Sequence, residues 1–105
     1  MAKSLGIFVT NPEQFKHVMG ITKAAKAKGS KVKVFFTWDA THNAKKEPGF
    51  KDLCELADDV SICADSYVKQ GYDVKDIPEG LDEKKMATQA QHGIIIEDYD
   101  CYLSL

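Results

Sequence analysis

The three cysteines of this chain, Cys54, Cys63 and Cys101, are its strongest candidates for chemistry. Their odd number and the absence of a Cys-x-x-Cys pair exclude a disulfide framework and a zinc knuckle, so at least one thiol stays free, as suits a reducing compartment. Cys63 ends a predicted strand directly before a predicted helix, where the positive end of the helix dipole stabilises a thiolate. This placement predicts nucleophilic sulfur chemistry at Cys63. The alternative is a small buried residue that closes the strand.

The other two cysteines fit different environments. Cys54 shares an apolar stripe with Phe50, Leu53 and Ala57 at helical spacing, so we expect it to be buried for structural reasons. Cys101 begins the last predicted strand, where it is either buried or a second exposed thiol.

Candidate binding residues follow the carboxyl ends of the predicted strands, where open parallel sheets bind their ligands. They are Trp38, His42, Asn43 and Ser66. His42 could act as a proton donor or a nearby cation, although a solvated loop histidine gives the same pattern. His17 and His92 have the spacing of ordinary helix-surface residues.

The composition excludes several other functions. The formal net charge is -2 and all 14 basic residues are lysines, whereas a nucleic-acid-binding protein needs a strongly basic surface. The chain has no phosphate-binding glycine loop and no cluster with metal-ligand spacing, so we expect no metal and no cofactor. No stretch approaches the roughly 20 apolar residues of a membrane helix. Residues 1–5 lead directly into a strand and do not resemble a signal peptide, so we expect a cytoplasmic protein without a membrane partner.

The elements that must position these residues alternate between strands and helices. Apolar runs predict strands at residues 5–9, 31–37, 60–63 and 100–105, with a fifth, poorly marked strand near residues 72–74. Capping and spacing predict helices between Asn11 and Gly29, over residues 50–57 and 64–70, and from residue 82 or 83 through Ala90. Residues 93–97 fit a helix or a strand.

This alternation predicts the fold class. The 105 residues form one domain (1–105), with a three-layer α/β fold around a mainly parallel sheet of about five strands.

Several segments, taken in order, resemble the DsrE/DsrF-like family of sulfur-relay proteins, including its TusD-like members. Residues 60–64 read as a strand that ends in a cysteine, and Gly71 follows eight residues after Cys63. Residues 76–80 form an acidic turn that ends in a second glycine. Residues 35–44 are similar to the family's second strand and active-site loop, and residues 100–105 to its short terminal strand.

The resemblance implies a function and an assembly. Cys63 would carry sulfane sulfur as a persulfide and pass it between sulfur donor and acceptor proteins, within a homo-oligomer that is a trimer or a hexamer. It also implies one helix over residues 82–97. Trp38 and His42, which follow the end of the neighbouring predicted strand, are the residues expected to shape the pocket. The alternative, from another functional class, is a non-catalytic binding or assembly subunit with an inert Cys63, because some family members lack the cysteine.

Overall fold

The computed structural model describes residues 3–105 and confirms the α/β fold class. Five parallel strands form one sheet in the order β4-β3-β2-β1-β5. Their bounds are Ser4–Val9 for β1, Lys31–Phe36 for β2, Asp59–Cys63 for β3, Met86–Ala87 for β4 and Cys101–Ser104 for β5. The chain therefore steps outward from β1 to β4 and then crosses the sheet to place β5 on the other side of β1.

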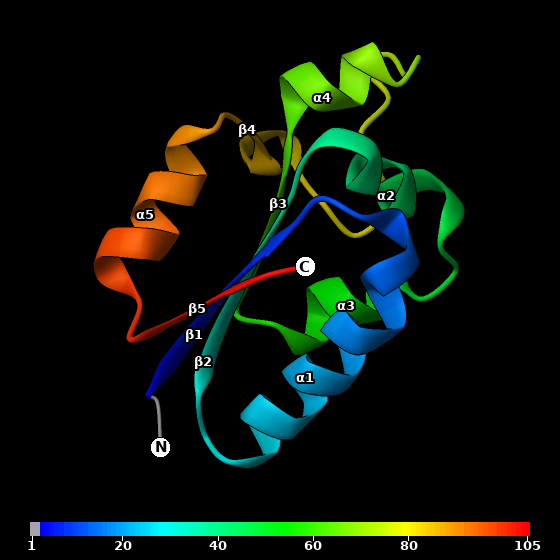
Figure 1. Cartoon of the computed structure of the whole chain (residues 1–105). Coiled ribbons are helices and arrows are strands. Elements are labelled where there is room, and N and C mark those ends of the chain that lie inside the picture. Colours follow the sequence, from blue (N-terminus) through cyan, green and yellow to red (C-terminus); the bar gives the residue numbers. More distant parts are fainter. Residues whose placement is uncertain (1–2) are drawn as a thin grey trace.

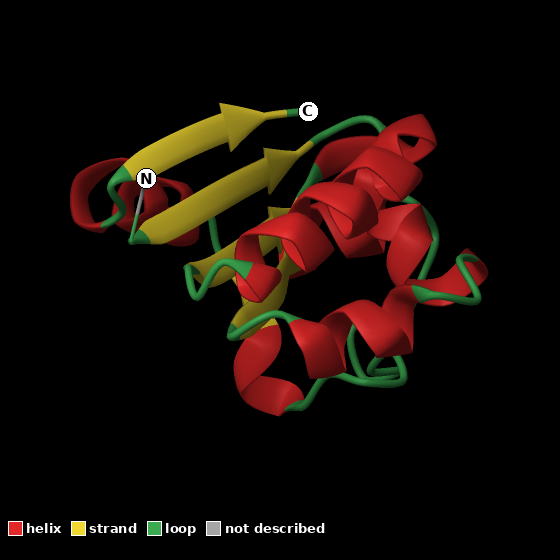
Figure 2. Ribbon diagram, turned by 90° about the horizontal axis from the view of Figure 1, so that it is seen from below, coloured by secondary structure: helices red, strands yellow, loops and turns green. Residues whose placement is uncertain are grey.

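Helices cover both faces of this sheet (Figures 1 and 2). One face carries α1 (Phe15–Ala27) and α3 (Phe50–Leu56), and the opposite face carries α5 (Ala90–Asp98). The short helix α4 (Ala64–Lys69) continues directly from β3 at the carboxyl edge, and α2 (His42–Lys46) follows β2. Three 3-10 turns complete the chain: η1 (Pro12–Gln14), η2 (Trp38–Thr41) and η3 (Glu83–Lys85).

The helix boundaries follow the predicted capping signals. The Asn11 side chain accepts a hydrogen bond from the Glu13 amide at 3.0 Å, and Pro12 occupies the first turn. Gly29 and Gly71 have φ of 83° and 97° just after α1 and α4, a left-handed conformation that favours glycine. These positions fix where each helix stops before the chain returns to the sheet.

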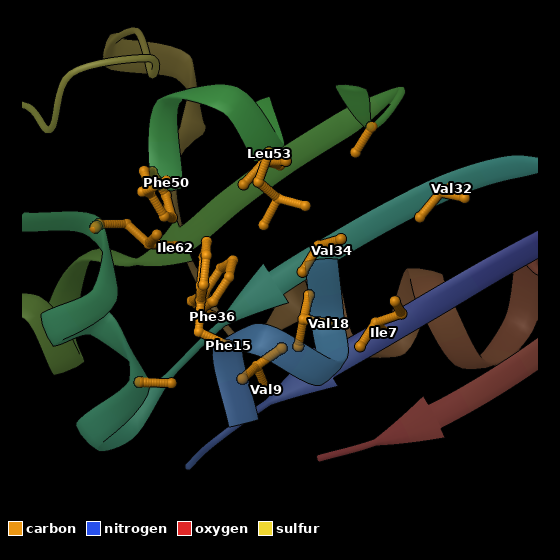
Figure 3. Packing of buried hydrophobic residues seen from close by; sticks show 14 of the residues in the cluster. Ile7, Val9, Phe15, Val18, Val32, Val34, Phe36, Phe50, Leu53 and Ile62 are labelled. Carbon is orange, nitrogen blue, oxygen red and sulfur yellow. The ribbon is translucent and has the colours of Figure 1, made fainter. Parts of the chain in front are cut away.

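The main hydrophobic core lies between the sheet and the layer of α1 and α3 (Figure 3). Phe36 is at its centre, with its ring centroid 5.3 Å from that of Phe50 and 6.4 Å from that of Phe15. The alternate residues of the strands face α5, where Phe8, Phe35, Cys63 and Ile95 form a smaller buried cluster. Cys63, the candidate reactive residue, therefore lies on the face of the sheet that α5 covers.

Two predictions about the second half of the chain are wrong. Residues 72–74 form no strand, because Tyr72 instead stacks on Tyr67 with ring centroids 4.8 Å apart. The fifth strand is β4, which pairs Met86 with Ile62 of β3. A helix over residues 82–97 is also wrong, because residues 86–87 pair with the free edge of β3 and interrupt it. Residues 93–97 are helical, within α5.

A smaller difference lies after β2. The short helix α2, which ends at Lys46, is absent from the predicted elements.

Close packing between β1 and α5 depends on one glycine. A methyl group added at Gly6 would lie 2.3 Å from Cγ2 of Ile95, a side chain that is fully buried. Gly6 therefore lets α5 approach the sheet closely over β1.

We expect Gly6→Ala to lower the free energy of unfolding by about 2 kcal/mol, because overpacking a core costs about 1–3 kcal/mol. The control is Gly20→Ala in α1, where nothing lies within 4 Å of the added methyl group. This control should stabilise the protein by about 0.5–1 kcal/mol, since alanine favours helix. Urea denaturation measures the free energy of unfolding of both variants. If Gly6→Ala leaves this free energy unchanged, the close packing of α5 on β1 is contradicted.

Candidate functional site

Cys63 lines a cleft of about 990 Å³ at the carboxyl edge of the sheet. The cleft lies between α4 on one side and the segment from β4 into α5 on the other. Cys63 is itself buried, with 3% of its surface exposed. The lining is mainly apolar and includes Phe8, which belongs to the same buried cluster as Cys63, and Ala87, which packs against that cluster. This is the place where parallel sheets bind their ligands.

Three polar side chains from different elements lower the pKa of the Cys63 thiol through hydrogen bonds. They come from Thr37 after β2, Ser66 in α4 and Gln89 before α5. The same three form a network, because Thr37 Oγ1 lies 3.2 Å from Ser66 Oγ and accepts a hydrogen bond from Gln89 Nε2 at 2.6 Å. Through Thr37, this network connects Ser66 on the α4 side of the cleft to Gln89 on the α5 side.

These groups set the pKa of the thiol. Burial raises the pKa of Cys63, but hydrogen bonds from the Ser66 side chain and backbone, from Gln89 and from Thr37 outweigh this effect. The pKa of Cys63 is therefore lowered from its ordinary value. By contrast, burial raises the pKa of Cys54 to about 11. At neutral pH the thiolate population is therefore concentrated at Cys63 when these two are compared.

The structure separates Cys101 from Cys63 within one chain. Cys101 begins β5 opposite Leu5 and packs against the main core on the α1 side of the sheet. Cys63 ends β3 and belongs to the cluster on the α5 side. The two thiols therefore lie on opposite faces and toward opposite edges of the sheet.

Of the four predicted binding residues, the structure brings two into the cleft with Cys63. Ser66 lines the cleft beside Cys63, and Trp38 lies on the rim with 59% of its surface exposed. Trp38 has a φ of 51°, a left-handed backbone conformation that is uncommon for a bulky side chain. This turn carries the chain from the buried Thr37 directly to an exposed ring.

The other two predicted residues lie away from the cleft lining. The His42 ring lies 2.8 Å from the Tyr72 hydroxyl through Nδ1 and 2.9 Å from Gln70 Oε1 through Nε2. Asn43 donates to the Pro12 carbonyl at 3.2 Å and so joins α2 to η1. Both side chains connect loops on the carboxyl side of the sheet without facing Cys63.

Sequence reasoning missed His92 and Gln89. His92, predicted as a helix-surface residue, lines the cleft and stacks on Phe8 with ring centroids 3.7 Å apart. Its Nε2 lies 2.6 Å from the Tyr102 hydroxyl. A signal was present, because Gln89, His92 and the buried Ile95 are spaced by three residues and therefore share one side of α5.

The remaining apolar rim consists of exposed side chains. Val68 and Val74 have 48% and 44% of their surfaces exposed, and both line the same cleft as Trp38. Asp65 and Lys69 pair with each other at 3.2 Å beside them, so this part of the rim has no excess charge. The cleft therefore favours a ligand or partner with an apolar contact surface.

Residues 3–105 show neither a metal-binding cluster nor a membrane-spanning helix. No group of three or more His, Cys, Asp or Glu side chains is placed to hold a metal ion. No described helix has the length and apolar character to cross a bilayer. Comparisons with known proteins likewise give no match to a family model, to a curated protein or to a solved structure.

Proposed function

We propose that this chain is a DsrE/DsrF-like sulfur-relay protein that carries sulfane sulfur as a persulfide on Cys63. The observation that carries the proposal is the hydrogen-bonded network of Ser66, Thr37 and Gln89, which lies beside Cys63 at an open cleft and lowers the pKa of its thiol. Three hydrogen-bonding side chains around a buried thiol stabilise its ionised form, which is the form that attacks sulfur. The order of the strand, cysteine and glycine segments supports the same family assignment.

The proposed reaction is an exchange between thiols and persulfides. The Cys63 thiolate attacks the outer sulfur of a donor persulfide, R–S–SH, and forms a new sulfur–sulfur bond. The bond between the two donor sulfurs breaks, and the donor leaves as the thiolate R–S⁻. Cys63 then carries –S–SH. An acceptor thiolate takes the outer sulfur in the same way and returns Cys63 to its thiolate, so no external oxidant or reductant is consumed.

The site suits both halves of this exchange. Hydrogen bonds to the Cys63 sulfur stabilise the thiolate as a nucleophile in the first step and as a leaving group in the second. The apolar rim formed by Trp38, Val68 and Val74 offers a contact surface for donor and acceptor proteins. We place this relay in the cytoplasm, since all three cysteines are free thiols and a reducing compartment keeps them so.

A second function has its own supporting observation. Only 3% of the surface of Cys63 is exposed, which is also typical of an inert structural cysteine. In that case the apolar cleft would serve a binding or assembly subunit without sulfur transfer. The experiment for the first proposal separates the two.

Incubation with glutathione persulfide should add the mass of one sulfur atom to the wild-type protein, and reductant should remove it. Cys63→Ser should gain none, because the nucleophile is lost, whereas the controls Cys54→Ser and Cys101→Ser should behave like wild type. Intact-mass spectrometry measures all four. Sulfur uptake by Cys63→Ser, or loss of uptake in Cys101→Ser alone, would refute the mechanism. A Cys63 that resists both sulfur and iodoacetamide until the protein unfolds would favour the binding subunit.

A further inference from the structure

Strand β5 leaves a free edge on the sheet. It is the last strand in the order β4-β3-β2-β1-β5, and none of the elements that residues 3–105 form lies beyond it in Figure 2. Leu105 donates to the Phe8 carbonyl at 2.8 Å and accepts from the Thr10 amide at 2.7 Å, so its main-chain groups face β1. Main-chain direction alternates along a strand. The amide and carbonyl groups of Tyr102 and Ser104 therefore face outward.

This edge lacks the usual protection against pairing. Edge strands are generally blunted by proline, lysine, a bulge or a covering element. Residues 101–105 read Cys-Tyr-Leu-Ser-Leu, with no proline and no charge. Cys101, Leu103 and Leu105 are only partly buried, although all three pack against the main core. A further strand beside β5 would cover these three side chains.

We propose that β5 of a second copy of this chain pairs antiparallel with this edge, across a two-fold axis at Leu103. This register makes Tyr102 and Ser104 of one copy face Ser104 and Tyr102 of the other, so their outward groups exchange four main-chain hydrogen bonds. Leu103 then faces its own copy as a non-hydrogen-bonded pair, the arrangement with the closest side chains. The strand is therefore complementary to itself.

The charges near β5 are compatible with this arrangement. Asp100, which precedes the strand, accepts hydrogen bonds from the Ser4 amide and hydroxyl at 3.1 Å. Each Asp100 lies three residues before the axis at Leu103, so the two Asp100 residues are six residue positions apart along the paired strands. At about 3.4 Å per residue they lie roughly 20 Å apart, well beyond the Debye length of about 8 Å at physiological salt. A parallel, in-register pairing would instead place the like charges side by side.

The proposal differs from the oligomer implied by the family resemblance and does not depend on the sulfur chemistry. A two-fold contact can occur in a dimer or within a hexamer, but a trimer cannot contain it. A different protein strand added to the same edge is the competing occupant, and it would leave the purified chain monomeric.

Analytical ultracentrifugation over a micromolar to millimolar series tests the pairing. Wild type should pass from a mass of 11.7 kDa toward twice that value as its concentration rises. Ser104→Pro should remain monomeric, because it removes an outward amide that β1 does not use. The matched control Ser104→Ala keeps this amide and should associate like wild type. A monomeric wild type, a trimer, or equal association of Ser104→Pro would overturn the proposal.

A cross-link tests the register independently, should Ser104→Pro fail to fold. Leu103→Cys, in a chain that also carries Cys54→Ser, Cys63→Ser and Cys101→Ser, should form a disulfide-linked dimer on mild oxidation, because the axis places the two side chains in contact. Ser104→Cys in the same background is the control, since its counterpart across the axis is Tyr102. Equal cross-linking of both variants, or none in Leu103→Cys, would exclude this register.

Discussion

Asp59→Asn should lower the free energy of unfolding by about 3 kcal/mol, because it leaves a buried lysine without its counter-ion. Asp59 at the start of β3 forms ion pairs with Lys33 of β2 and, at 2.6 Å, with Lys85 of η3. Only 6% of the Lys33 side chain is exposed, so water cannot replace the lost carboxylate. Urea denaturation at neutral pH measures this loss of free energy of unfolding.

The same pair gives stability a defined pH dependence. Burial raises the pKa of Asp59, but hydrogen bonds and charges from Lys33 and Lys85 outweigh it, and the pKa is lowered from 3.8. A carboxyl with a lower pKa in the folded state stabilises the protein above its unfolded pKa. This contribution is lost as the pH falls below 3.8 and through the folded-state pKa. Asp59→Asn should therefore be less sensitive to acid than wild type.

Two controls isolate the buried charge. Glu79→Gln removes an exposed pair with Lys51 and should change stability by no more than the error of measurement. The double variant Asp59→Asn with Lys33→Met should recover most of the loss, since it removes the unpaired charge as well. Equal destabilisation by Asp59→Asn and by the double variant would show that the lysine charge is not the cause.

Ser66→Ala should change the reactivity of Cys63 in opposite directions at neutral and high pH. A hydrogen bond to a charged group contributes about 1.5–3 kcal/mol, so its loss lowers the thiolate population at neutral pH about tenfold. The thiolate that remains is about threefold more nucleophilic, because nucleophilicity rises with basicity. The net rate with iodoacetamide should fall about threefold at neutral pH and rise about threefold where both proteins are fully ionised.

The matched control for this experiment is Ser61→Ala. Ser61 precedes Cys63 by two residues on the same side of β3, and its buried hydroxyl has no hydrogen-bond partner among the residues that the structure describes. For Ser61→Ala, the curve of iodoacetamide reaction rate against pH should coincide with that of wild type. Curves of wild type and Ser66→Ala that do not cross would contradict the claim that Ser66 acts by stabilising the thiolate.

Residues with strong local signals were predictable from the sequence. The buried strands that hold Phe8, Phe35 and Cys63 are apolar runs, and Asn11 and Gly29 mark the limits of the first helical segment. These features depend on capping, backbone conformation and burial, all of which act over a few residues. The cleft beside Cys63 follows from the parallel sheet that these strands form.

The features that the sequence did not predict depend on distant partners. Two residues, Met86 and Ala87, form β4 only because the edge of β3 is free to pair with them. Gln89 reaches the site through a hydrogen bond to Thr37, which is 52 residues away. His92 is directed by Phe8 and Tyr102, which belong to opposite ends of the chain. Such contacts have no local pattern, because tertiary pairing overrides intrinsic propensity.

The strand order also determines how long the sheet stays incomplete during synthesis. β1 is translated first and can pair with β2 early, but its other edge must wait for β5, whose neighbouring contact Ser4–Asp100 spans 96 residues. At about 5–20 residues per second, translation leaves that edge of β1 open for roughly 5–20 s. During this interval β5 of a neighbouring copy whose synthesis is finished can occupy it, so polysomes that hold many copies close together favour strand exchange between chains.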